Sequence, residues 1–155
     1  MIGVCFEKIG CVQVRELPDP AIETSNDAIV RVSLAGLCGS DLHPFFGREA
    51  GLEPGTVMGH EFVGEVIATG SNVKNIRVGD RVCSPFTTSC GQCYYCTAGL
   101  TSRCTTGQLF GWRQNDKGLH GGQASLVRVP LADGTLMPIP AGMSDETALL
   151  LGDNL

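Results

Sequence analysis

Four cysteines lie close together in the second half of the chain, in the pattern C-x2-C-x2-C-x7-C: Cys90, Cys93, Cys96 and Cys104. Two residues between cysteines allow a tight turn to direct both thiolates at one ion, and a third and a fourth cysteine complete a tetrahedral shell. A closed shell leaves no open coordination position, so we expect a structural zinc that stabilises a lobe over about residues 86–107. The alternatives are two disulfides, which strain three such closely spaced cysteines, and a redox pair, which needs a CxxC that opens a helix after a strand.

A second group of potential ligands is spread along the chain: Cys38, Ser40, Asp41, His43, His60, Glu61 and Asp153. Thiolate, imidazole and carboxylate groups together are typical of a zinc site with three protein ligands and a fourth position for water or substrate. Each residue alone has a more ordinary interpretation, because a single histidine beside a strand is usually a core residue and a single cysteine usually packs as a small hydrophobe. The spacing alone leaves both interpretations open.

The elements that must position these groups are mostly short strands. Apolar and polar residues alternate between turn residues in five segments: 12–17, 28–34, 62–67, 78–82 and 123–130. Strands of this length and spacing favour an antiparallel, barrel-like sheet. Helix signals are few, namely a short turn near Ser40 and a helix over residues 147–151 that the segment Ser144-Asp145-Glu146 caps. The 21 glycines and 8 prolines also disfavour a helical bundle.

Charge and composition exclude several classes of function. The 155 residues carry 11 Lys and Arg against 16 Asp and Glu, a formal net charge of −5, whereas a nucleic-acid binder usually needs a basic face. No apolar run is long enough to span a membrane, and the first residues do not read as a signal peptide. We therefore expect a cytoplasmic protein with neither a nucleic-acid nor a membrane partner, whose clustered cysteines bind metal.

Several motifs, in the same order along the chain, resemble landmarks of the zinc-dependent alcohol dehydrogenases of the medium-chain dehydrogenase/reductase family. The sequence Gly59-His60-Glu61-Phe62-Val63-Gly64, followed by Gly70 and Val73, is similar to the zinc signature of that family. The segment 38–43 resembles the one that carries the first zinc ligand, and residues 78–82 and the four cysteines resemble the next two landmarks. The resemblance covers essentially the whole chain.

The resemblance implies a role for each residue of the second group. Cys38, His60 and Asp153 resemble the ligands of a catalytic zinc, and Glu61 resembles a neighbouring glutamate that can approach or leave the metal. The sequence around Asp153 is similar to the subgroup with an aspartate ligand, which includes bacterial secondary-alcohol and formaldehyde dehydrogenases. Asp41 would orient the ligand histidine. Ser40 and His43 resemble a proton relay, and Phe86 and Trp112 fall near positions that line the substrate pocket. For Trp112, ordinary packing in the core or at an interface is the alternative.

The resemblance also implies a mostly β fold, the GroES-like, partly open β-barrel with a structural-zinc lobe. The cofactors would be one structural and one catalytic zinc, with NAD or NADP receiving hydride from a small-molecule alcohol. No G-x-G-x-x-G and no βαβ alternation occur in the sequence. We therefore expect residues 1–155 to be the N-terminal catalytic domain of a dehydrogenase whose Rossmann domain is missing from this chain. Such a fragment alone would be inactive, and the full-length protein would be a homo-oligomer that acts on an alcohol or aldehyde.

The main rival is a non-enzymatic GroES-like zinc-binding module. It would share the four-cysteine lobe but would have no need for Cys38, Ser40, His43 and His60, so two metal ions per chain would favour the dehydrogenase. A zinc-ribbon nucleic-acid binder is disfavoured because Arg103 is the only basic residue between Cys90 and Cys104.

Overall fold

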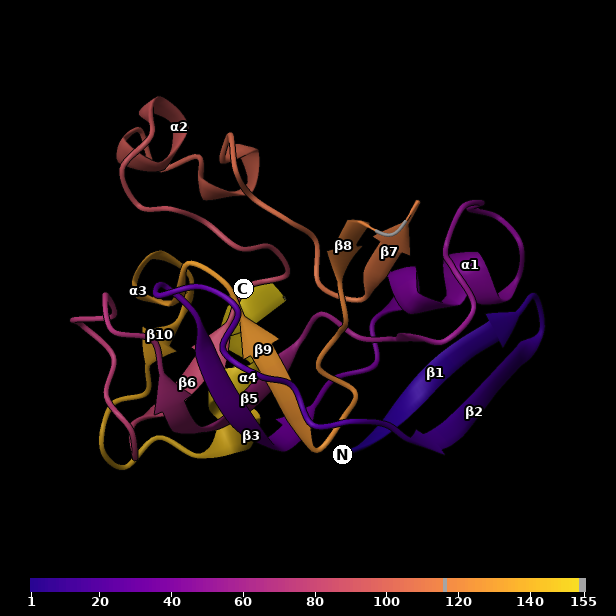
Figure 1. Cartoon of the computed structure of the whole chain (residues 1–155), viewed down its shortest axis with the longest axis horizontal. Coiled ribbons are helices and arrows are strands. Elements are labelled where there is room, and N and C mark those ends of the chain that lie inside the picture. Colours follow the sequence, from indigo (N-terminus) through magenta and orange to yellow (C-terminus); the bar gives the residue numbers. More distant parts are fainter. Residues whose placement is uncertain (116, 154–155) are drawn as a thin grey trace.

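The computed structural model describes residues 1–115 and 117–153, and antiparallel strands are its main regular elements (Figure 1). Its larger sheet has five strands in the order β10-β6-β5-β3-β9. These strands are β3 (Ala28–Ala35), β5 (Phe62–Thr69), β6 (Arg81–Ser84), β9 (Leu126–Val129) and β10 (Met137–Pro138). The central pair, β3 and β5, runs from Ala28 opposite Thr69 to Ala35 opposite Phe62. That register brings the residues that follow β3 next to those that precede β5.

A smaller sheet has the order β2-β1-β4 and lies at the other end of the molecule (Figure 1). It contains β1 (Ile2–Lys8), β2 (Cys11–Glu16) and the two-residue β4 (Thr56–Val57). The two sheets are linked through the segment before β9, where Gly3 forms a bridge with Ala124 and the Val4 N–H donates to the Gln123 carbonyl at 2.9 Å. A hairpin of β7 (Trp112–Gln114) and β8 (Lys117–Leu119) completes the strands.

The main core is formed by side chains of the larger sheet and of the segments that pack against it. Val30, Val66 and Val82 are fully buried, and the ring of Phe62 packs edge-to-face on that of Phe110 with centroids 5.2 Å apart. These contacts bury apolar surface, and each Å² buried contributes roughly 25 cal/mol to the free energy that stabilises the sheet carrying the site.

The buried carboxylate of Asp27 links the segment just before β3 to the neighbouring strand β9. Asp27 has no exposed surface, and its Oδ2 accepts from Arg128 Nη1 at 2.9 Å and from the Thr24 N–H at 3.0 Å. Burial would raise the pKa of Asp27, but the Thr24 hydroxyl and N–H, together with Arg128, outweigh burial and lower it. The ionised form of Asp27 is therefore built into the folded state.

The helices are short. The 3-10 turn η1 (Gly39–Asp41) and helix α1 (Leu42–Phe45) follow β3, while α2 (Tyr94–Thr97) and the turn η2 (Thr101–Arg103) belong to a lobe that stands away from both sheets (Figure 1). Helix α3 (Ala132–Thr135) follows β9, and its Thr135 hydroxyl accepts from the Ser89 N–H at 3.0 Å, which ties the base of the lobe to the body. The longest helix is α4 (Asp145–Asp153).

The strand predictions are confirmed for the segments 12–17, 28–34, 62–67 and 123–130, within a few residues at their ends. The fifth, over 78–82, is wrong in its boundaries because the strand is Arg81–Ser84. Asp80 closes a turn before it, with Oδ2 accepting from the Arg77 N–H at 2.8 Å, and Val78 is 61% exposed. The helix after Ser144 is confirmed, since the Ser144 hydroxyl accepts from the Thr147 N–H at 3.3 Å. Among the described residues no helix is long and apolar enough to cross a membrane.

Candidate metal centre

The four cysteines of the lobe come together as their spacing predicts. One Sγ from each of Cys90, Cys93, Cys96 and Cys104 lies within 4.8 Å of the others. The Cys93 N–H donates to Cys90 Sγ and the Cys90 N–H donates to Cys104 Sγ, both at 3.3 Å. Backbone N–H groups of Cys96 and Thr105 lower the pKa of Cys93 to about 6. Amides directed at sulfur stabilise the thiolate, the form that ligates metal.

A second cluster lies where three elements meet: its ligand atoms, one each from Cys38, His60, Glu61 and Asp153, also lie within 4.8 Å of one another. Cys38 follows β3 and precedes η1, whereas His60 and Glu61 immediately precede β5. The β3–β5 register, with Gly36 N–H donating to the Glu61 carbonyl at 2.9 Å, holds these two segments side by side. Asp153 ends α4, which packs against both β5 and β6.

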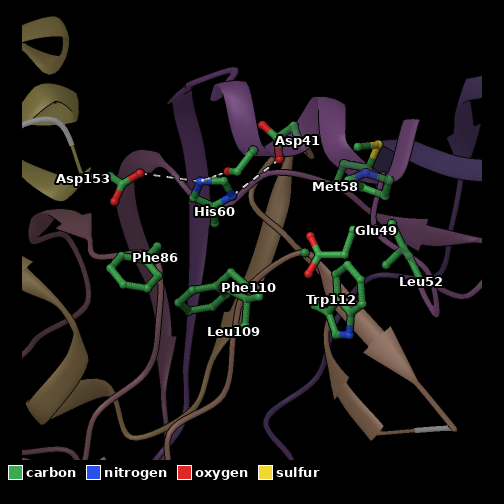
Figure 2. Close-up of a pocket in the computed structure, with 13 residues that line it drawn as sticks. Asp41, Glu49, Leu52, Met58, His60, Phe86, Leu109, Phe110, Trp112 and Asp153 are labelled. Atoms are coloured by element: carbon green, nitrogen blue, oxygen red, sulfur yellow. Dashed lines mark hydrogen bonds and ion pairs between the residues drawn. The ribbon is translucent and has the colours of Figure 1, made fainter. Parts of the chain in front are cut away.

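His60 has its two ring nitrogens in different surroundings. Nδ1 lies 3.4 Å from Asp41 Oδ1, while Nε2 lies 3.3 Å from Ser40 Oγ and 3.6 Å from Asp153 Oδ2 (Figure 2). Cys38 Sγ is in turn 3.8 Å from the same Asp153 oxygen. When Nδ1 carries the proton that Asp41 accepts, the Nε2 lone pair faces the space between Cys38 and Asp153.

Asp41 acts as the fixed partner of this imidazole. It is 7% exposed, and its second oxygen, Oδ2, accepts from the Cys38 N–H at 3.0 Å and from Gln123 Nε2 at 3.1 Å. The hydrogen bond to Asp41 raises the pKa of His60 to about 9, against the lowering effect of burial and with a smaller contribution from Cys38. A proton and a metal ion therefore compete for this ring.

Gln123 is a part of the site that sequence reasoning missed. Its side-chain amide donates both to Asp41 and to the Gly36 carbonyl at 3.0 Å, so it fixes the carboxylate that orients His60. The only sequence signal was a polar residue directly after Gly121 and Gly122, at the start of an apolar strand. That signal does not distinguish a structural amide from an exposed one.

Two glycines make room for these side chains. A Cβ at Gly36 would lie 2.0 Å from Glu61 Oε2 and 3.0 Å from Glu61 Cβ, so only glycine leaves the buried Glu61 in place. Gly59 has a φ of +88°, and a Cβ there would lie 2.4 Å from Gln123 Cγ. The Gly59-His60-Glu61 sequence therefore depends on glycine for its backbone conformation as well as for its packing.

A cleft opens beside His60 and Asp153. Its volume is about 310 Å³, and its walls combine carboxylates with apolar and aromatic side chains, among them Phe86, Leu109, Phe110 and Trp112 (Figure 2). Phe86 and Trp112 thus both line the cleft, as the resemblance implied, and Trp112 also packs against the small core cluster of Phe6, Leu52 and Met58. A mostly apolar hollow with polar ligands at one end has the form of a small-molecule site.

Comparison with known proteins assigns the family. Residues 24–141 match the model of the alcohol dehydrogenase GroES-like domain. The chain belongs to this family. It is 49% identical to zinc-type alcohol dehydrogenase B of Aspergillus flavus over 99% of this chain and 35% of that protein. Its structure matches alcohol dehydrogenase TADH from Thermus sp. ATN1 with a TM-score of 0.92 at 40% identity, covering 99% of this chain and 44% of the other.

A further match is a short-chain alcohol dehydrogenase from E. coli CFT073 complexed with NADH, with a TM-score of 0.75 at 34% identity over 97% of this chain and 42% of that one. The chain spans from 35% to 51% of the length of the first curated relatives that it matches. The predicted GroES-like fold and the resemblance to zinc-dependent alcohol dehydrogenases are thereby confirmed.

Not every predicted residue of this GroES-like domain lies in the cluster. Ser40 lines the cleft and contacts His60, but His43 is exposed on α1 and does not line the cleft. Within the part of the chain that the structure describes, no hydrogen bond joins the Ser40 hydroxyl to the His43 ring. A relay between them would need an intervening water or ligand hydroxyl, and it stays a prediction.

Proposed function

We propose that Cys38, His60 and Asp153 bind a catalytic zinc, with Glu61 beside it, and that the four cysteines of the lobe bind a structural zinc. The observation that carries the proposal is the convergence of one thiol, one imidazole and two carboxylates to within 4.8 Å of one another at the end of a cleft. Cys38 and Asp153 are 115 residues apart, so local chain geometry does not bring them together.

The donor sets fit zinc at both places. Zinc accepts sulfur, nitrogen and oxygen ligands in tetrahedral sites, and it uses four thiolates for structural sites and three mixed ligands plus an open position for catalytic ones. In the lobe, backbone N–H groups already point at two of the sulfurs. In the second cluster, the hydrogen bond between His60 and Asp41 is the outer contact that zinc-binding histidines usually make.

The chain's own residues would bind and orient an alcohol there. The chemistry that zinc supplies at such a site is Lewis acidity, which acidifies a hydroxyl group. Ser40 Oγ, 3.3 Å from His60 Nε2, is placed to accept the proton of a substrate hydroxyl and to pass its own proton outward, with His43 as the predicted next carrier. Phe86 and Phe110 would exclude water from the carbon side of the substrate.

For the whole protein we propose a zinc-dependent dehydrogenase that oxidises a small alcohol, or reduces the matching aldehyde, by hydride exchange with NAD or NADP. A solved relative complexed with NADH supports the nicotinamide cofactor. We further propose a homo-oligomer in the cytoplasm, where a reducing environment keeps zinc-binding cysteines as thiols. All eight cysteines are free in the structure.

The rival function is a non-enzymatic zinc-binding module. It accounts for the lobe, but it gives no reason for a second ligand cluster at the end of a cleft lined by aromatic side chains. The geometry therefore favours the dehydrogenase.

Metal analysis of purified chains tests the proposal. We expect two zinc ions per wild-type chain and one per chain in His60→Ala. The matched control is His120→Ala, which removes a half-buried histidine outside both clusters and should keep two zinc ions. Replacement of zinc by Co²⁺ should give two distinct visible spectra, of which His60→Ala loses only one. One zinc per wild-type chain, unaffected by His60→Ala, would favour the non-enzymatic module.

A further inference from the structure

Glu49 is a carboxylate in the cleft that the proposed zinc chemistry does not use. It lies in the loop after α1 and lines the cleft together with Trp112, Leu52 and Met58. Figure 2 shows its carboxylate on the Trp112 side of the pocket, across from His60 and Asp153. No hydrogen bond or ion pair connects Glu49 to any residue in the described ranges 1–115 and 117–153.

The loop holds Glu49 at the cleft without neutralising it. The Arg48 N–H donates to the His43 carbonyl at 2.8 Å, which continues the chain from the end of α1. The Arg48 guanidinium lies over the ring of Phe46, 5.4 Å from its centroid, and Phe46 does not line the cleft. The neighbouring cation is thus engaged elsewhere, and the Glu49 carboxylate is available to a ligand.

The other charged groups of the wall are compensated among themselves and leave Glu49 unneutralised. Of its three carboxylates, Asp41 is paired with His60 and Asp153 belongs to the proposed zinc site, so Glu49 is the one without a positive partner, and among the described lining residues there is no lysine or arginine. Trp112 adds an aromatic surface on the same side as Glu49 (Figure 2). A carboxylate and an indole ring that line the same cleft are a combination that binds organic ammonium groups, through ion pairing and through the attraction of a cation to the ring.

We propose that Glu49 and Trp112 form a cation subsite and that the preferred alcohol carries a protonated amine a few atoms from its reacting hydroxyl. The hydroxyl end would lie at His60 and Asp153, so this part of the inference rests on the proposed function. A cavity of about 310 Å³ accommodates a short amino alcohol of this kind. Glu49 would act as a specificity residue and take no part in proton transfer.

The single tryptophan of the chain provides a direct measure of binding, because Trp112 lies in the subsite. Zinc-loaded chain is titrated at neutral pH with 4-amino-1-butanol and, separately, with 1-pentanol, which has the same number of heavy atoms but no charge. We expect tighter binding of the amino alcohol by the change in Trp112 fluorescence. We also expect added salt to weaken the amino alcohol selectively, because the ion pair is partly exposed to solvent.

Glu49→Gln isolates the charge because it keeps the shape of the side chain. The variant should weaken 4-amino-1-butanol by about fivefold, the upper range for an exposed ion pair, and leave 1-pentanol unchanged. The matched control is Glu16→Gln, which removes a charge from an exposed position at the end of β2 and should alter neither ligand. A third titration, with 1,4-butanediol, separates charge from hydrogen bonding. If Glu49→Gln weakened binding of the diol fivefold as well, any hydrogen-bond donor would satisfy Glu49, and the cation assignment would be overturned.

Failure of this inference is distinguishable from failure of the proposed function. If the chain holds two zinc ions and Glu49→Gln binds both ligands as the wild type does, the cation subsite is wrong and the zinc assignment stands. If neither ligand changes Trp112 fluorescence, the subsite is also overturned. If the second zinc is missing but n-butylammonium still binds and depends on Glu49, the subsite stands and the proposed function fails.

Discussion

Asp41→Asn should weaken zinc binding at the proposed site of Cys38, His60 and Asp153, because it reverses the proton arrangement of His60. In the wild type, Asp41 Oδ2 accepts from the Cys38 N–H and from Gln123 Nε2, while Oδ1 faces His60 Nδ1 at 3.4 Å. Asparagine has one oxygen, which the two fixed donors would take. Its NH2 group must then face Nδ1, which becomes the acceptor, so the neutral ring carries its proton on Nε2. The lone pair that faces Cys38 and Asp153 is lost.

The expected magnitude follows from the burial of this pair. The side chains of His60 and Asp41 are only 10% and 6% exposed, so solvent does not readily replace the lost contact. Removing such an outer partner of a zinc-binding histidine typically costs 10–100-fold in metal affinity, or about 1.4–2.7 kcal/mol. The four-cysteine site lies in a different lobe and should keep its affinity.

Zinc competition with a chromophoric chelator measures both sites in one titration, and nitrogen NMR of the imidazole reports which ring nitrogen carries the proton. The matched control is Asp19→Asn, whose carboxylate is 68% exposed and pairs with the chain's amino terminus. An Asp41→Asn chain that binds two zinc ions with wild-type affinity would refute the orienting role of Asp41. Equal weakening of both sites would also refute it, because it would indicate general destabilisation.

Three other perturbations test separate parts of the structure. Cys96→Ser should remove one zinc per chain and make residues 92–106 sensitive to protease while the sheets stay folded, as measured by mass spectrometry of the fragments. Gly59→Ala should lower the free energy of unfolding by about 1–3 kcal/mol, since its Cβ would lie 2.4 Å from Gln123 Cγ at a positive φ; an unchanged denaturation midpoint would contradict this. Because the pKa of Asp27 is lowered on folding, its contribution is complete above about pH 4 and is lost as the pH falls toward the folded pKa. Asp27→Asn should therefore destabilise the chain by about 2 kcal/mol at neutral pH and flatten the acid limb of its stability curve, as shown by denaturant titrations at several pH values.

The two ligand clusters differ in how far they are predictable from sequence. All four cysteines of the lobe fall between Cys90 and Cys104, so turn geometry alone brings their sulfurs together, and the C-x2-C-x2-C-x7-C spacing suffices to predict it. The second cluster needs the β3–β5 register and the docking of α4 before Cys38, His60 and Asp153 meet. Residue types and spacing left it ambiguous, and only the resemblance to a family named its members.

The places of Gln123 and Glu49 in the site could not be predicted from the sequence. Neither residue belongs to a local motif, and each acquires its place through contacts between distant segments: Gln123 reaches Asp41 from 82 residues away, and Glu49 meets the cleft wall opposite His60. The error in the predicted start of β6 has the opposite cause, because it comes from a local contact. The turn at Asp80 outweighs the apolar alternation that predicted a strand from residue 78. Strand propensity is weak enough for one well-formed turn to override it.

Because the two clusters depend on different parts of the fold, we expect zinc bound at each of them to stabilise a different part of the chain. Zinc bound only by the folded state stabilises whichever part of the chain must be ordered to form its site. For the lobe, that part is a short segment tied to the body at Ser89 and Thr135, so its zinc should stabilise the lobe locally. For Cys38, His60 and Asp153, that part includes β3, β5 and α4, so zinc there should stabilise the larger sheet as a whole. Hydrogen exchange in β3 and β5 should therefore slow when the second site fills and stay unchanged when only the lobe does.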